Sequence, residues 1–475
     1  MFRYVNKLYL KSVLSCFVIV FFSGTFENIN AVTPTALAAP KTDSIIEETF
    51  FIESSDATVG YAVAVDEAGN VFMAGTSKTQ WGSPVNQHSG GAGDCFVAKL
   101  HADGALQWNT FLGGRLSDGC RAIALDEKGN VYVTGESSSN WAKPLKPFNG
   151  GSSDCFIAKL NADGALQWNT FLGSAFYDGG YAIAVDKTEN IFVTGNSVGS
   201  WGSPRVPHSK RNNDAFAAKL DRKGTLHWNT FWGGDDFDGG YAIALDGDGN
   251  VYIAGESGAG WGSPVNDYIR GYLGDYDAVV TKLDSKGDLQ WHTFMGGIGS
   301  DYGRGIALDR KGYIYVTGNS NVSWGQPIAP HQGGYDAFAA RLDEKGFLQW
   351  HTFMGGKGAD YCRAISLDLT DSLLLAGQSS TSWGAPVNEF SSEKDAYVAK
   401  LSSNGYLDWN TFLGGTGSDF GRSITTDRVG NIYLGGESSS PWGMSAGNFQ
   451  ARTNAFVANL NNAGVIRWNS FLGTK

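Results

Sequence analysis

Side chains that suit the binding of anions and sugars recur in this 475-residue sequence at intervals of about sixty residues. Guanidinium forks match carboxylate or sulfate groups, and phenol rings offer an apolar wall to a sugar or a peptide. One set comprises Tyr61, Arg121, Tyr181, Tyr241, Arg304, Arg363 and Arg422. A second set follows it along the chain and contains Glu136, Glu256 and Glu437, with Thr76, Asn196, Asn319 and Gln378 at the matching positions. The interval indicates that both sets occupy equivalent positions of a structural repeat.

No catalytic or metal-binding spacing accompanies these side chains. The sequence lacks G-x-S-x-G and H-E-x-x-H motifs, and its seven histidines are scattered. Asp246, Asp248 and Asn250 resemble the start of a calcium loop, but no glutamate stands twelve positions along. The matching segments DEAGN, DKTEN and DRVGN are typical of hairpin turns. We therefore expect neither a metal nor a cofactor.

A nine-residue phrase, LQWNTFLGG at residues 106–114, marks the repeat. It returns in variants whose tryptophans are Trp108, Trp168, Trp228, Trp291, Trp350, Trp409 and Trp468. A repeat array builds one core from many units, so the length of the chain does not imply several domains. Seven copies predict seven units, and residues 44–51 (SIIEETFF) align with the phrase as a degenerate eighth outer strand.

Each unit divides into four strand-like pieces. In the second copy these are CRAIALD, VYVTGES, DCFIAKL and ALQWNTFL, joined by the turn EKGN, a long loop and the turn NADG. Consecutive antiparallel strands with Gly-containing turns are typical of a propeller blade. The first strand carries small residues such as Ala122 and Ala124, whereas the fourth carries Trp and Phe, as wedge-shaped blades require. The predicted fold is all-β, with blades at about 52–109, 110–169, 170–229, 230–292, 293–351, 352–410 and 411–475.

The units resemble the bacterial SBBP repeat, a seven-bladed β-propeller repeat. Its core D-x-G-x-x-I-A-x-D-x-x-G-N-x-Y-x-x-G is similar to SDGCRAIALDEKGNVYVTG at 117–135 and to FDGGYAIALDGDGNVYIAG at 237–255. The resemblance covers residues 49–475 and implies a single propeller. It implies no particular activity, because fold does not determine function.

The short turns of every blade lie at one face of the predicted propeller, and the long loops between second and third strands lie at the other. The two sets of polar side chains converge on this loop face, at the mouth of the central channel, beside a ring of first-strand aspartates at Asp118, Asp178, Asp238, Asp301, Asp360 and Asp419. Two interpretations stay open. The charges pair between blades and lock the ring, or they form a ligand site, which the concentration of arginines in blades five to seven favours.

The long loops supply two further candidate features. One tryptophan per loop recurs, at Trp81, Trp141, Trp201, Trp261, Trp324, Trp383 and Trp442, either as a plug between blades or as a platform for sugars. The longest loop, 258–276, carries Tyr268, Tyr272 and Tyr276, and we expect it to protrude most as an outer binding surface.

Four cysteines lie within the propeller repeats. Cys95 and Cys155 share one repeat position, and Cys120 and Cys362 share another. Equivalent positions in successive blades are too far apart for a disulfide, so we expect four buried free thiols.

The N-terminal segment predicts export. Arg3, Lys7 and Lys11 precede an apolar run at 13–22, and an A-L-A sequence ends at Ala38. These features are typical of a signal peptide over residues 1–38, followed by a short lead-in at 39–48 and one propeller at 49–475. No second apolar segment predicts a membrane span, and a net charge of −11 disfavours nucleic acid. We expect a monomer in the periplasm, in the medium or at the cell surface.

These features favour a non-enzymatic binding or scaffold module that presents its loop face to a protein or glycan partner. Two alternatives are an extracytoplasmic lyase or hydrolase with its site at the channel mouth, and a structural cell-surface or adhesion module. An enzyme would require an acid or base in the mouth that is free of structural partners.

Overall fold

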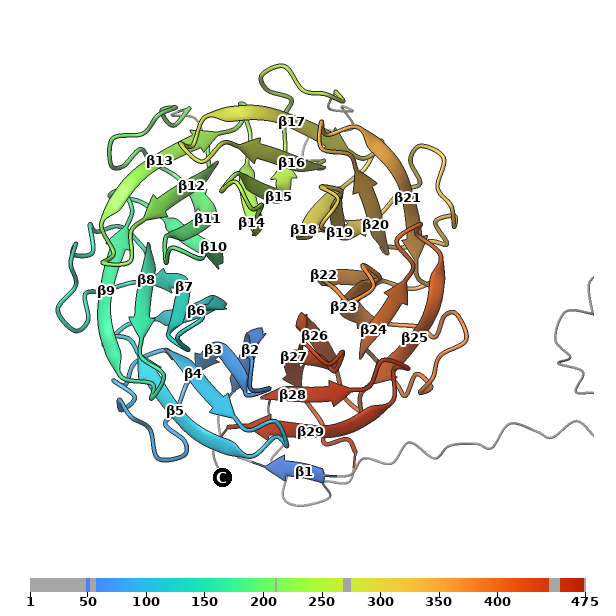
Figure 1. Ribbon diagram of the computed structural model, residues 1–475, viewed down its shortest axis with the longest axis horizontal. Coiled ribbons are helices and arrows are strands. Elements are labelled where there is room, and N and C mark those ends of the chain that lie inside the picture. Colours follow the sequence, from blue (N-terminus) through green and yellow to red (C-terminus); the bar gives the residue numbers. More distant parts are fainter. Residues whose placement is uncertain (1–47, 52–56, 210–211, 268–274, 444–452, 474–475) are drawn as a thin grey trace, which may run out of the picture. The chain divides into compact units, whose positions relative to one another are not determined.

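The computed structural model describes residues 48–51, 57–209, 212–267, 275–443 and 453–473, with side chains from residue 57 onward. Seven antiparallel sheets stand as blades around a central axis (Figure 1). The predicted all-β, seven-bladed fold is confirmed. The described part of the chain contains no helix that could cross a membrane.

Each blade is built from four consecutive strands, with the first strand nearest the axis and the fourth at the outer edge, as the repeat predicts. In blades one to four the strands are β2 (Thr58–Val65), β3 (Val71–Ser77), β4 (Asp94–Leu100) and β5 (Leu106–Leu112); β6 (Asp118–Leu125), β7 (Val131–Ser137), β8 (Asp154–Leu160) and β9 (Leu166–Leu172); β10 (Asp178–Val185), β11 (Ile191–Ser197), β12 (Asp214–Leu220) and β13 (Leu226–Trp232); β14 (Asp238–Leu245), β15 (Val251–Ser257), β16 (Asp277–Leu283) and β17 (Leu289–Met295).

Blades five to seven repeat the pattern with β18 (Asp301–Leu308), β19 (Ile314–Ser320), β20 (Asp336–Leu342) and β21 (Leu348–Met354); β22 (Asp360–Leu367), β23 (Leu373–Ser379), β24 (Asp395–Leu401) and β25 (Leu407–Leu413); β26 (Asp419–Thr426), β27 (Ile432–Ser438), β28 (Asn454–Leu460) and β29 (Ile466–Leu472). The predicted cuts fall inside the outer strands. For example, β5 continues to Leu112, beyond the expected boundary at 109.

The N-terminal strand β1 (Glu48–Phe51) pairs in parallel with β29, the outer strand of the seventh blade (Figure 1). The expectation that this segment pairs near the seam is therefore confirmed. Because β2 to β5 and β26 to β29 each form a full blade, β1 completes neither of them and adds a fifth strand to the last sheet.

The first hairpin of each blade is set by an aspartate at its start. Asp126 accepts hydrogen bonds from the backbone amides of Lys128 and Asn130 at 2.9 Å each, and Gly129 takes a left-handed φ of 77°. Asp246 closes the corresponding turn of blade four in the same way, which confirms the hairpin interpretation of that segment over a calcium loop.

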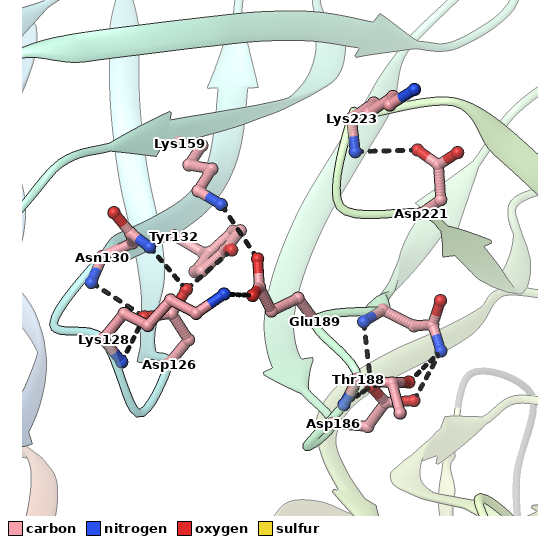
Figure 2. A network of polar contacts seen from close by, with 11 residues as sticks. Asp126, Lys128, Asn130, Tyr132, Lys159, Asp186, Thr188, Glu189, Asp221 and Lys223 are labelled. Carbon is pink, nitrogen blue, oxygen red and sulfur yellow. Dashed lines mark hydrogen bonds and ion pairs between the residues drawn. The ribbon is translucent and has the colours of Figure 1, made fainter.

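In blade three Glu189 replaces the turn glycine and keeps a left-handed φ of 62°. Its carboxylate pairs with Lys128 and, at 3.4 Å, with Lys159, both from blade two (Figure 2). An ion pair between two blades thus accompanies a backbone conformation that glycine adopts more readily.

The tryptophan of the repeated phrase joins each blade to the next. The indole N–H of Trp108 donates to the carbonyl oxygen of Ala162 at 3.2 Å, in the outer hairpin of the following blade. Its ring lies against Gly164, where a Cβ would come within 2.8 Å of the indole. Trp468 makes the same contacts with Ala102 and Gly104 of blade one, and so closes the ring.

The loop tryptophans are plugs between blades, and their interpretation as a sugar platform is wrong. Trp81 is only 2% exposed and packs edge-on against Phe96 and Phe111, with ring centroids 5.4 and 5.8 Å apart. The outer strand holds the loop in place, because the Asn109 amide donates to the carbonyl oxygen of Trp81 at 2.8 Å. In two blades histidine performs this task, as in the contact of His351 with the Trp324 carbonyl.

The prediction of four free thiols is wrong for two of the cysteines. Cys95 on β4 and Cys120 on β6 form a disulfide, with Cα atoms 4.8 Å apart. The two cysteines occupy different repeat positions, and the third strand of one blade lies against the first strand of the next. Cys155 and Cys362 are free and buried, as expected.

Removing the disulfide should lower stability measurably. A double Cys95→Ala, Cys120→Ala variant is expected to lose about 3 kcal/mol of unfolding free energy, because a closed loop of this length restricts the unfolded chain. Urea unfolding measures the loss. Conversely, Ala337→Cys should form the equivalent bridge with Cys362, since both residues lie in one buried cluster. Thiol titration of the denatured, unreduced protein checks the assignment. Reaction of all four propeller cysteines in the unmodified protein would contradict the disulfide.

Candidate functional site

The first candidate set occupies one β-bulge in every blade. The pairing of β6 with β7 shifts register between Cys120 and Ala122, so Arg121 has no partner in the ladder. The same shift leaves out Tyr61, Tyr181, Tyr241, Arg304, Arg363 and Arg422. A bulge bends its strand and redirects the side chain of the extra residue. We call this set, with the ends of the second strands, the mouth.

Three of the four mouth arginines have carboxylate partners. Arg121 pairs with Glu136 within blade two, and Arg422 pairs with Glu437 within blade seven. Arg304 reaches back to Glu256 of blade four at 2.7 Å, because its own blade has an asparagine at that position. The interpretation of these charges as pairs between blades is therefore confirmed for Arg304 and Glu256, and it is wrong for Arg121 and Arg422, whose glutamates lie in their own blades.

Tyrosines link the ion pairs into a nearly continuous ring. The guanidinium of Arg121 lies 4.5 Å from the ring centre of Tyr61, and that of Arg304 lies 4.1 Å from Tyr241. Tyr181 stacks on Tyr241 with centroids 5.1 Å apart. The expected aromatic wall of blades three and four is present.

Arg363 differs from the other mouth arginines. No carboxylate pairs with it among the described residues, since Gln378 stands where blades two and seven have glutamate. Burial, with repulsion from the guanidiniums of Arg422 and Arg304, lowers its pKa to about 10. The Oε1 atom of the buried Gln378 lacks a hydrogen-bond partner, whereas an unpartnered Nε atom is common to Arg363, Arg304 and Arg422. Four guanidiniums thus face three mouth glutamates, and the excess charge is in blade six.

Three segments of the chain match the model of a family described as SBBP, a beta-propeller repeat: residues 107–140, 290–323 and 408–441. This chain is a β-propeller that carries SBBP repeats. Each match begins in an outer strand and ends just before the loop tryptophan of the next blade. The unit of the family therefore spans the junction that the tryptophan contacts hold together.

The SBBP propeller also matches longer curated proteins. Regulatory protein FlaEY of Caulobacter vibrioides is 30% identical over 380 residues, which cover 77% of this chain and 34% of the relative. An uncharacterized WD repeat-containing protein of Acanthamoeba polyphaga mimivirus is 22% identical over 456 residues, 74% of this chain and 32% of the relative. This chain spans about a third of the length of these curated relatives.

Two of the solved structures that this chain resembles share 10% sequence identity with it. One is the Pan2 WD40 domain of Neurospora crassa, with a TM-score of 0.45 over 79% of this chain and 85% of its own. The other is hydrazine synthase of Kuenenia stuttgartiensis, with a TM-score of 0.47 over 80% and 93%.

Sequence reasoning missed an aromatic collar around the mouth of the SBBP propeller. Tyr276, Tyr302, Tyr335 and Tyr361 follow one another with centroids 5.8, 6.2 and 5.5 Å apart. Tyr177, Phe237 and Phe420 stand at related positions in other blades. All flank an aspartate that begins a first or third strand, and this recurrence was a usable signal. Tyr276 thus lies in the collar, while Tyr268 and Tyr272 lie outside the described residues.

The first-strand aspartates are not part of the ligand-facing surface. Asp118 is fully buried, where it accepts a hydrogen bond from the Gly114 amide at 2.8 Å and another from the Ser137 hydroxyl. Asp178, Asp238, Asp301, Asp360 and Asp419 are buried in the same way. Their place in the predicted mouth is therefore wrong, because they lie between blades.

The mouth glutamates offer no free acid or base. Glu136 accepts from Arg121 through one oxygen and from the Tyr177 hydroxyl, at 2.7 Å, through the other. Glu256 accepts from Tyr241 at 3.0 Å in addition to its arginine. Within the described residues, no group of three or more His, Cys, Asp or Glu side chains could hold a metal.

Proposed function

We propose that this SBBP propeller is an exported, non-enzymatic binding or scaffold module that receives an anionic group of a protein or glycan partner at Arg363. The observation that carries the proposal is that one mouth guanidinium, that of Arg363, has no carboxylate partner among the described residues. A charge left unpaired away from water costs free energy, and an incoming anion would remove that cost.

The neighbours of Arg363 suit such a partner. Tyr361 lies 5.7 Å from its guanidinium and continues the row of collar tyrosines. Tyrosine and arginine are the side chains that dominate binding energy at protein interfaces, and tyrosine also packs well against sugars. A partner would therefore place its anion on Arg363 and its less polar part along the collar.

Export rests on the predicted signal peptide and agrees with the disulfide between blades one and two. Structural disulfides persist in oxidising compartments outside the cytoplasm. The Caulobacter relative is named a regulatory protein, which is compatible with a binding role. An enzymatic function has less support, because each mouth glutamate already serves a structural partner.

Gln378→Glu tests the proposal by supplying the missing carboxylate. The variant copies blades two and seven, so Arg363 should pair internally, the melting temperature should rise, and the affinity for an anionic ligand should fall roughly 10- to 100-fold. Arrays of acidic and neutral glycans and peptides, followed by titration of the hits, measure the change. Arg363→Ala should lose the same hits without loss of stability, because no ion pair is broken.

Glu437→Gln is the matched control. It breaks the Arg422 pair, so it should lower stability while the acidic hits are retained. The proposal fails if the unmodified protein binds no acidic ligand, or if its acidic hits bind Gln378→Glu and Arg363→Ala with unchanged affinity.

A further inference from the structure

A separate cavity opens on the loop face between blades one, two and three. Its volume is about 440 Å³, within the range of small-molecule sites. Its lining includes Tyr61, Lys78, Arg121, Glu136, Ser153 and Tyr177. Tyr61, Arg121 and Glu136 belong to the mouth in blades one and two, whereas Arg363 lies in blade six.

The cavity exists because the aromatic collar is interrupted here. The residues that flank the first-strand aspartate position are Ala57 and Val59 in blade one, and Ser117 and Gly119 in blade two. Blades three to seven each have an aromatic residue at one of these two positions. Blade seven has Phe420 where blade two has Gly119, although the two blades share the same arginine and glutamate pair.

Polar groups line this gap. The hydroxyl of Ser153 is buried without a hydrogen-bond partner, in a residue that is 6% exposed. Ser138 and Ser152 line the same cavity, and the exposed Lys78 lies at its edge. A buried polar atom without a partner is rare in a folded protein and calls for a specific reason, such as a ligand or a water.

The charges of the cavity are largely balanced. Arg121 is neutralised by Glu136, and the Tyr177 hydroxyl also donates to that carboxylate. A strongly anionic ligand would be repelled by Glu136 as well as attracted by Lys78. An apolar ligand would leave the serine hydroxyls without hydrogen-bond partners. Hydroxyl groups beside the rings of Tyr61 and Tyr177 suit a neutral ring that both donates and accepts hydrogen bonds.

We infer that this cavity binds one sugar ring, a neutral pyranose, either free or at the end of a glycan. The Ser153 hydroxyl and the Glu136 carboxylate form hydrogen bonds with the hydroxyl groups of the sugar, and Tyr61 and Tyr177 contact its less polar face. The site is independent of Arg363, so either proposal can fail without the other.

Gly119→Phe tests the inference by completing the collar. A Cβ at this glycine meets only the Thr76 hydroxyl, at 2.9 Å, and Phe420 shows that the fold accommodates the side chain. We expect an unchanged melting temperature and at least a tenfold loss of sugar affinity. The probes are glucose, galactose, mannose and N-acetylglucosamine, each alone and at the end of an oligosaccharide, titrated by saturation-transfer NMR and calorimetry.

Ser153→Ala keeps the test decisive if the larger side chain disturbs the blade. Removing an unpartnered buried hydroxyl should leave stability equal or higher, whereas sugar affinity should fall several-fold. Gln378→Glu is the control and should bind the sugar normally. Binding of the free monosaccharides indicates a soluble ligand, and binding of the oligosaccharides alone indicates a glycan end. The inference is overturned if no probe binds saturably, or if both cavity variants bind the sugar with the affinity of the unmodified protein.

Discussion

Trp468→Ala is expected to cost roughly 3–5 kcal/mol of unfolding free energy, the range for removal of a large buried aromatic side chain. Trp468 is 6% exposed, and its indole donates to Ala102 at 3.1 Å across the seam between the last and first blades. Ser470 supports the same junction by donating to the Gly104 carbonyl at 2.9 Å. The chain does not run from the end of blade seven into blade one, so the seam depends on such contacts and on the pairing of β1, which precedes β2, with β29.

Trp291→Ala is the matched control for the seam. Trp291 makes the same bond to Glu344 at 3.1 Å, but it is half-buried and joins two blades that the chain also connects. We expect a smaller loss there, measured by urea unfolding with fluorescence and circular dichroism. Equal losses at both positions would show that ring closure is no more demanding than any other junction.

The protein should become more stable as the pH falls from about 7.5 to 5. At six junctions between blades, the aspartate that begins the third strand of one blade lies near the aspartate that begins the first strand of the next blade. Where the two carboxylates are closest, the glycine that follows the outer strand lies between them. A Cβ at Gly173 would lie 2.6 Å from Asp154 and 2.9 Å from Asp178. Burial, with the charge of Asp178, raises the pKa of Asp154 to about 7, and burial raises the pKa of Asp419 to about 7 and that of Asp118 to about 6.

The sign follows from proton binding. Between pH 4 and 7 the folded protein keeps protons on these carboxyls that the unfolded chain has released, so stability falls as the pH rises through this window. Each unit of pKa shift is worth about 1.4 kcal/mol, so one strongly shifted carboxyl contributes on the order of a few kcal/mol. The turn aspartates have lowered pKa values, for instance Asp186, so their contribution is lost only below about pH 4.

Asp154→Asn isolates the effect, and the protein contains a natural precedent for it. The seam has Asn454 and Thr58 in place of the two aspartates. The variant should flatten the dependence of melting temperature on pH between 5 and 7.5 and raise stability at pH 7.5. Asp186→Asn should lower stability at pH 7.5 and leave that slope intact, because it removes the negative charge and replaces the oxygen that accepts from the Asn190 side chain with an amide donor. A melting temperature that rises with pH in this window would contradict the pairing.

The architecture could be predicted because the sequence of each repeat specifies its own four strands and turns. Alternating small and aromatic strands, turn sequences and seven copies of one phrase specify blades whose strands pair with their sequence neighbours. Trp108 was correctly placed in the outer strand, and the buried loop position of Trp81 agrees with a plug. Blade boundaries were three residues short because the outer strand continues past the tryptophan into the threonine and phenylalanine.

The candidate site was predicted only in outline. The positions of Arg121 and Glu136 were found, but a repeat alignment could not say which arginine pairs with which glutamate. Arg304 takes its partner from the preceding blade, and Arg363 takes none among the described residues. The collar was missed because its members stand before the aspartate in some blades and after it in others.

The sequence by itself determined the fold class, the number of blades and the strand order, because each of these follows from contacts between residues close along the chain. Only the tertiary structure decided what happens across the junctions between blades. There Cys95 meets Cys120, pairs of aspartates share a gap, and a glycine at position 119 leaves a cavity. These outcomes depend on the distances between side chains of two different repeats. The sequence pattern of one repeat does not specify those distances.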